Sequence, residues 1–125
     1  MPDTVFPAYD PTNIFARILR GEIPNKTVLE TAHTLAFHDI HPQAPVHVLV
    51  IPKGAYVTFA HFAAQASDEE IADFHRCAAQ VCDMVGLNAD GFRAITNAGQ
   101  NGHQEVPHYH LHILGGRPLG PMLLR

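Results

Sequence analysis

The 125-residue chain is poor in basic residues and in cysteine. Eight lysines and arginines stand against twelve acidic residues, and the formal net charge is -4. This balance argues against a general nucleic-acid-binding protein, because such proteins normally carry a basic patch. The two cysteines, Cys77 and Cys82, fall in one predicted helix, about 7.5 Å apart along its axis and about 140° apart around it. That separation is too large for a disulfide, so nothing favours an oxidising compartment.

Hydrophobic targeting and anchoring segments are also lacking. No apolar run approaches the roughly 18 residues of a membrane span. The first residues have neither the basic region nor the apolar region of a signal peptide. We therefore expect a soluble, cytoplasmic protein. The length fits one domain, which we place at residues 12–118, after an irregular N-terminal arm at 1–11 and before a C-terminal tail at 119–125.

Hydrophobic spacing and turn residues predict the helices and strands. Apolar residues at helical spacing predict a short helix at 13–20, which Thr12 can cap and Gly21 can end. Ser67 and Glu70 have the spacing of a capping box at the start of a long helix. The remaining elements are a further short helix at 58–65, the long helix at 67–86, and strands at 27–31, 34–39, 46–52, 91–97 and 106–116.

The order of these elements predicts the fold class. A helix, three strands, a long helix and two strands favour an α+β domain with a five-stranded antiparallel sheet and one or two short helices besides the long one. The strand at 46–52 is apolar on both faces, which predicts a central strand that is covered on both sides. Val46, Val48 and Val50 should point one way, and His47, Leu49 and Ile51 the other.

Ten histidines are the oddity of the composition, and only one stretch concentrates them. His108, His110 and His112 alternate, so in a strand they would share a face, about 6.5–7 Å apart from one to the next. The opposite face would present Tyr109, Leu111 and Ile113 to a core. Three imidazoles on one face are costly to bury without partners, so the arrangement requires an explanation.

Three interpretations of this histidine face differ in chemistry. The histidines could be half exposed on a solvated sheet. They could bind zinc, although a straight strand spreads the first and third too far apart, and a further ligand would have to come from elsewhere. They could act on phosphorus, because a neutral histidine of the correct tautomer is a nucleophile and its neighbours can donate to phosphate oxygens. Backbone N–H groups of the loop at 102–106 could hold the same oxygens. We favour this third interpretation.

The motif also resembles a known family. His-x-His-x-His followed by apolar residues, within 104–114, is similar to the histidine triad (HIT) family of nucleotide-binding proteins and hydrolases. Three further blocks resemble the family in the same order: NIFARILRGEIP at 13–24, LAFHDIHPQAPVHVLVIPK at 35–53, and the turn at 97–99. The resemblance spans roughly residues 12–118.

The resemblance implies a HIT-like antiparallel sheet with helices, pairing into a homodimer with a continuous sheet, and action on the α-phosphorus of purine nucleotides. By position, His110 would be the nucleophile and His112 would contact the phosphate. His108 would orient groups behind the nucleophile, and His47 would match the family's fourth histidine, which helps to orient the nucleophilic ring. Asp39 would accept hydrogen bonds from the ribose hydroxyls.

The same resemblance assigns the rest of the nucleotide site. Asn97 and the backbone around Gln104, Glu105 and Val106 would hold the phosphate. The base pocket would be lined by Phe15, Ile18, Ile23, Phe37, His38 and Ile40. Two positions depart from many relatives: Glu105 replaces the Ser or Thr of many animal members, although Glu is common in bacterial-type relatives. His103 stands where many relatives have glycine, and would be strained if φ is positive there.

Structural alternatives exist for several of these residues. Asp39 could simply be a turn residue, and His47 a core histidine whose hydrogen bonds are satisfied. Phe15, Ile18 and Phe37 could be ordinary core residues. Four histidines outside the motif are assigned to the surface: His33, His41, His61 and His75.

Two segments indicate a branch of the family. Leu114–Arg117 and the block at 39–45 most resemble nucleoside phosphoramidases, which hydrolyse a P–N bond to release a nucleoside monophosphate and an amine. His110 would displace the amine, with acid assistance, and water would then cleave the nucleotidyl-histidine. The alternatives are a dinucleoside polyphosphate hydrolase, a nucleotide-binding regulatory protein and a metallohydrolase. We expect no cofactor, no metal, no nucleic acid and no membrane partner.

Overall fold

A five-stranded antiparallel sheet organises the chain in the computed structural model, which describes residues 6–123. The strand order is β1-β2-β3-β5-β4, and each neighbouring pair is antiparallel. The strands are β1 (Thr27–Glu30), β2 (Thr34–His38), β3 (Val46–Pro52), β4 (Phe92–Ile95) and β5 (Leu111–Gly115). The predicted α+β class and the five strands are confirmed.

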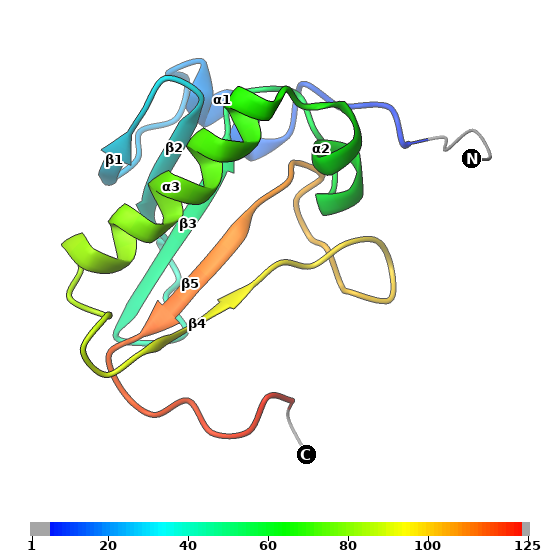
Figure 1. Cartoon of the computed structure of the whole chain (residues 1–125). Helices are drawn as coiled ribbons and strands as arrows, with labels where there is room; N and C mark the ends of the chain where they lie inside the picture. The colour runs from blue at the N-terminus through cyan, green and yellow to red at the C-terminus, as the bar shows by residue number, and fades with distance from the viewer. Residues whose placement is uncertain (1–5, 124–125) are drawn as a thin grey trace.

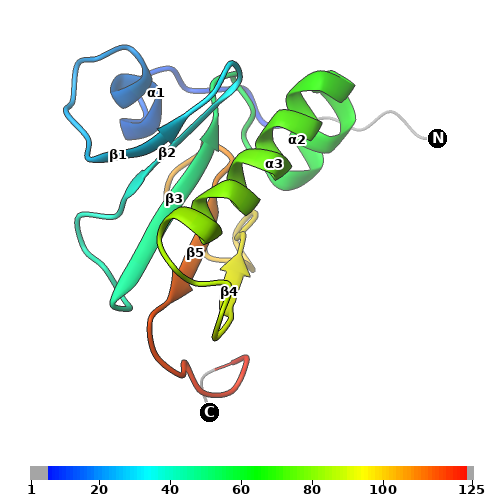
Figure 2. The ribbon, with the colours of Figure 1, turned by 60° about the vertical axis from the view of Figure 1, so that its left-hand side comes forward.

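Three helices cover the two faces of the sheet: α1 (Ile14–Leu19), α2 (Phe59–Gln65) and α3 (Asp68–Met84). The long helix α3 runs across one face with α2 at its end (Figure 1). The short helix α1 lies on the opposite side, near β1 and β2 (Figure 2). None of these helices is long and apolar enough to cross a membrane.

The central strand β3 contributes to a hydrophobic core on each face. Val48 and Val50 pack with Phe74 under α3, whereas Leu49 and Ile51 pack under α1. This alternation confirms the prediction that β3 is buried on both sides. Next along β3, on the α1 face, lies His47, which is 2% exposed. The sheet therefore separates a mainly apolar layer under α3, where the buried Thr34 hydroxyl donates to Asp73, from a layer under α1 that also holds histidines.

The ends of the helices agree with the predicted signals at all but one position. The side chain of Ser67 accepts from the N–H of Glu70 and the capping box is complete. The cap of α1 is Asn13 rather than Thr12, and this prediction was wrong. Thr12 instead donates its hydroxyl to Asp10, and the Asn13 side chain accepts from the backbone N–H that is three residues ahead. Both residue types can cap a helix, and this competing contact decides between them.

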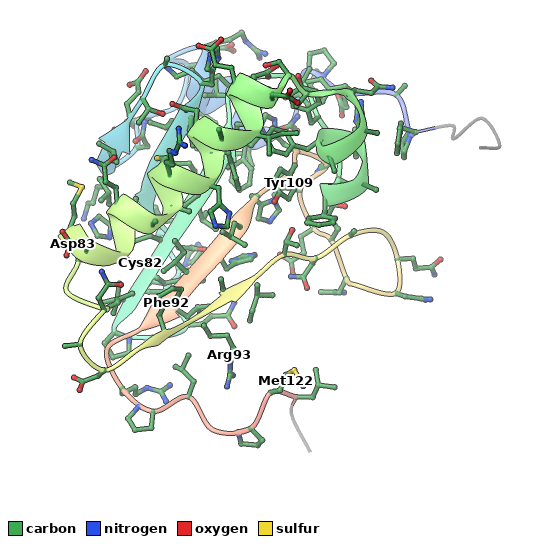
Figure 3. All side chains as sticks on the ribbon, in the orientation of Figure 1. Cys82, Asp83, Phe92, Arg93, Tyr109 and Met122 are labelled. Carbon is green, nitrogen blue, oxygen red and sulfur yellow. The ribbon has the colours of Figure 1, made fainter. Side chains whose placement is uncertain are left out.

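The last strand is shorter than the predicted 106–116, because ladder pairing starts only at Leu111. Two features account for the late start. Pro107 has no N–H to donate, and the carbonyl of His110 accepts from the Thr96 hydroxyl instead of from a neighbouring strand. The side chains still alternate before the strand begins: Tyr109 packs against Phe62 under the helices (Figure 3).

One histidine assigned to the surface is buried. His61, on α2, is 8% exposed. Its Nδ1 accepts from the backbone N–H of Val57, and its ring stacks on Phe6 at 4.8 Å. Both contacts come from segments that helical periodicity does not reveal.

Cys77 and Cys82 lie buried and free on α3, as predicted. The outer edge of β4 has no partner strand among the described residues, and the expected dimer stays a prediction.

Candidate active site

A cleft of about 380 Å³ opens on the α1 face of the sheet, where β3 and β5 approach the loop at 97–106. It is lined by Phe15, Asp39, Gln43, Leu49, Asn97, Gly102, His103, Glu105, Val106, His110 and His112. Two of the three alternating histidines therefore face this cleft. One larger cavity, of about 480 Å³, lies at residues 86–91 and 116–118, and neither it nor the smaller cavities found among the described residues is lined by a histidine.

The proton position on His110 follows from one short hydrogen bond. Its Nδ1 lies 2.6 Å from the carbonyl oxygen of His108. A carbonyl can only accept, so Nδ1 must carry the hydrogen and Nε2 must carry the lone pair. Burial lowers the pKa of His110, although the bond to the carbonyl partly offsets this. At neutral pH the ring is therefore an uncharged imidazole with a nucleophilic Nε2.

His108 supports the site from behind and does not line the cleft. Its side chain is fully buried, and its Nε2 lies 2.8 Å from the carbonyl oxygen of Pro52. By the same reasoning Nε2 donates, and Nδ1 accepts from the hydroxyl of Tyr9 at 2.7 Å. Burial lowers the pKa of His108 to about 4, so this ring too is neutral.

His47 and His112 are joined by a hydrogen bond whose donor and acceptor can be assigned. The backbone N–H of Gln43 donates to Nδ1 of His47 at 3.1 Å, which places the hydrogen of His47 on Nε2. That Nε2 donates to Nδ1 of His112 at 2.9 Å, so His112 in turn carries its hydrogen on Nε2. Burial lowers the pKa of His112 to about 4 and also lowers the pKa of His47. His112 thus offers the cleft a neutral N–H donor, which suits a phosphate oxygen.

Among the described residues, one group of side chains is close enough together to hold a metal ion. It consists of Asp39, His47 and His112, whose ligand atoms lie within 4.8 Å of one another. A histidine ligand must present a lone pair to the ion. His47 cannot do so at Nε2 while its Nδ1 accepts from the Gln43 backbone, because a neutral ring has only one lone pair in its plane. The donor chemistry of this cluster therefore favours the hydrogen-bonded pair over a metal site.

The sequence-predicted nucleotide residues divide into four groups. The cleft is lined by Phe15, Asp39, Asn97, Glu105 and Val106. In the core beneath it lie Ile18 and Phe37, with Ile23 partly buried against them, whereas His38 and Ile40 are exposed around the end of β2. The side chain of Gln104 turns from the cleft and donates to the carbonyls of Val57 and Val106.

Sequence reasoning missed two residues that line the cleft, Gln43 and Leu49, whereas Gly102 belongs to the loop at 102–106 that it had proposed for the phosphate. Leu49 could have been found, since it shares a strand face with His47 and pairs across the sheet with His112. Gln43 lies in the block at 39–45, but its role depends on a backbone N–H, which residue identity does not indicate.

The loop at 97–106 carries backbone strain and negative charge. His103 has φ of 57°, the positive value that makes a non-glycine residue unfavourable. Its Nε2 lies 3.2 Å from the carboxylate of Glu105, and both side chains are exposed. Glu105 and Asp39 place two carboxylates on the lining, which includes no lysine or arginine. The cleft therefore disfavours a ligand that carries several negative charges.

The cleft thus presents neutral histidines of defined tautomer, and one ring nitrogen with a free lone pair faces it. Comparison with known proteins identifies the family. The HIT domain family matches residues 20–119. The chain therefore belongs to the HIT family.

Individual relatives are similar over nearly the whole chain. An uncharacterised 13.2 kDa HIT-like protein from Azospirillum brasilense is 56% identical over 117 residues, covering 94% of this chain and 96% of the relative. The purine nucleoside phosphoramidase of Escherichia coli is 43% identical over 110 residues, covering 88% and 92%. A solved histidine triad protein from Clostridium difficile has a TM-score of 0.77 at 38% identity, covering 88% and 95%.

The buried neutral histidines make stability depend on pH. Burial lowers the pKa of His108 from 6.5 to about 4, so between these values the unfolded chain binds a proton that the folded chain does not. The free energy of unfolding should therefore fall as the pH falls, by about 2 kcal/mol from His108 alone between pH 7.5 and pH 5. Urea unfolding at the two pH values measures this difference.

A matched control is His75→Gln, which removes an exposed histidine on α3 and should leave the pH dependence unchanged. Equal stability of the wild type at pH 7.5 and pH 5 would contradict the assignment of a buried neutral His108.

Proposed function

We propose that this protein is a nucleotide-binding hydrolase that cleaves the P–N bond of purine nucleoside 5′-phosphoramidates. The observation that carries the proposal is the hydrogen bond from Nδ1 of His110 to the carbonyl of His108, which leaves Nε2 free as a nucleophile. The similarity to a relative named purine nucleoside phosphoramidase supports the choice of substrate.

The proposed reaction has two displacements at phosphorus. Nε2 of His110 attacks the α-phosphorus, a P–Nε2 bond forms, and the bond to the amine nitrogen breaks. The amine leaves with that electron pair and takes up a proton. Water then attacks the same phosphorus and loses a proton, which balances the proton taken up by the amine. The nucleoside monophosphate leaves, and the P–Nε2 bond electrons return to the ring. The modified ring is cationic in between, and the His108 carbonyl stabilises it by accepting a charge-assisted hydrogen bond from Nδ1.

The remaining lining residues suit the parts of a nucleotide. Nε2–H of His112 and the amide of Asn97 can donate to the phosphate oxygens, with the backbone N–H groups of Glu105 and Val106 beside them. The backbone N–H of Gln104, which the sequence also assigned to the phosphate, instead donates to the carbonyl of Gly99 at 3.1 Å. Asp39 can accept from both ribose hydroxyls. Phe15 and Leu49 offer an apolar wall for the base, and the core residues Ile18, Ile23 and Phe37 would support that wall from beneath.

Charge favours the phosphoramidase over the dinucleoside polyphosphate hydrolase. The Glu105 carboxylate acts on both cleft histidines and partly offsets the lowering of the pKa of His110 and of His112. A polyphosphate leaving group would bring further negative charge beside this carboxylate, whereas an amine brings none. Solvent screens the exposed Glu105 carboxylate, but repulsion between like charges at the rim of the cleft still disfavours the polyphosphate.

Turnover in the presence of EDTA tests the proposal. Wild-type protein should release AMP from an adenosine 5′-phosphoramidate faster than it cleaves a dinucleoside polyphosphate, and His110→Ala should lower turnover by at least about 10³-fold because the covalent route is lost. His75→Gln, far from the cleft, serves as the control. Activity that appears only when zinc replaces EDTA would contradict a metal-independent nucleophile.

Substitution of Glu105 tests the charge argument separately. Glu105→Gln keeps the size of the side chain and removes its charge. It should raise kcat/KM for the dinucleoside polyphosphate by on the order of fivefold, which corresponds to about 1 kcal/mol of repulsion removed, and change kcat/KM for the phosphoramidate by less than about twofold. Steady-state kinetics on both substrates give the ratio. Parallel changes on the two substrates would show that Glu105 does not select the leaving group.

A further inference from the structure

We propose that Tyr9 is a positioning residue for the nucleophile, acting through His108. The Tyr9 hydroxyl oxygen lies 2.7 Å from Nδ1 of His108, and the two rings meet edge to face at 5.5 Å. Tyr9 lies outside residues 20–119, which the HIT domain matches. The inference concerns the same site as the proposed function and rests on it only where turnover is measured.

The segment that carries Tyr9 is anchored on both sides. It runs from beside α2 to the start of α1 (Figure 1). Phe6 stacks on the buried ring of His61 at one end. At the other end, the side-chain amide of Asn13 donates to the carbonyl of Asp10, and the Asn13 oxygen caps α1. These contacts hold Tyr9 against the rear of the site.

The hydroxyl completes the set of bonds that hold His108. The fully buried ring lies between the hydroxyl on Nδ1 and the Pro52 carbonyl on Nε2, and the His108 backbone N–H donates to the carbonyl of Val106 at 2.8 Å. The carbonyl of this same residue accepts from His110 at 2.6 Å. Because the ring and backbone are both held, the carbonyl has a defined direction toward the nucleophile.

Loss of the hydroxyl would leave a buried ring nitrogen without a donor, which is unfavourable. The ring can recover a partner only by shifting toward the space that the hydroxyl filled, and the carbonyl of His108 must move with it. The carbonyl is what keeps the hydrogen of His110 on Nδ1. If the His108 carbonyl moves away, His110 can also adopt its other tautomer, in which Nε2 carries the hydrogen and cannot attack.

The test compares Tyr9→Phe with Tyr56→Phe. The control loses a tyrosine hydroxyl that binds Glu70 at 2.8 Å, and its side chain does not line the cleft. Histidine ring nitrogens labelled with ¹⁵N report each tautomer by NMR and need no substrate. We expect His110 as a single Nδ1–H tautomer in the wild type and in Tyr56→Phe, and a mixture of two tautomers in Tyr9→Phe.

With a substrate that the wild type turns over, kcat of Tyr9→Phe should fall on the order of tenfold while KM stays within about twofold, because attack depends on the orientation of His110 and nucleotide binding does not. Tyr56→Phe should match the wild type. An unchanged His110 tautomer in Tyr9→Phe would overturn the inference, even if kcat fell, since the hydroxyl would then act by another route. Absence of turnover by the wild type would contradict the proposed function and leave the NMR comparison decisive for Tyr9.

Discussion

The hydrogen bond between Nδ1 of His110 and the carbonyl of His108 is the contact on which the account of this site depends. It determines which ring nitrogen holds the proton, and so converts a buried histidine into a nucleophile without any charged partner in contact with it. Serine nucleophiles need an adjacent base to remove a proton. A neutral imidazole of this tautomer needs none, because its second nitrogen already carries a lone pair.

Burial and hydrogen-bond direction act together around this contact. Four histidines lie at or behind the cleft, and burial lowers the pKa of each one. A neutral ring donates at one nitrogen and accepts at the other. The Gln43 N–H therefore sets the direction of the hydrogen bonds through His47 to His112, and the Pro52 carbonyl sets the direction of those at His108. The sheet makes this possible because β3 is covered on both faces, which keeps water from the rings behind the cleft.

The sequence predicts the sheet, its central strand and the shared face of the three histidines, because period-two alternation is local information. It could not show which nitrogens carry protons, because this depends on the groups that each ring meets in the fold. The carbonyl that accepts from His108, for example, belongs to Pro52, on a strand that is distant along the chain. Tyr9 is 99 residues from its partner His108, and no periodicity links them. For Ile18 and Phe37 the sequence left both the base pocket and the core open, because one apolar pattern serves both environments, and the structure places them in the core beneath the cleft.

Trapping the covalent intermediate tests the central claim most directly. The protein would be mixed with an adenosine 5′-phosphoramidate in EDTA, denatured within milliseconds at alkaline pH, where phosphorus–nitrogen bonds to histidine persist, and digested for mass spectrometry. The account predicts a nucleotidyl group on His110, attached at Nε2, and none in His110→Ala. A nucleotidyl group on another residue, or AMP release with no modified His110 at any time during turnover, would contradict it.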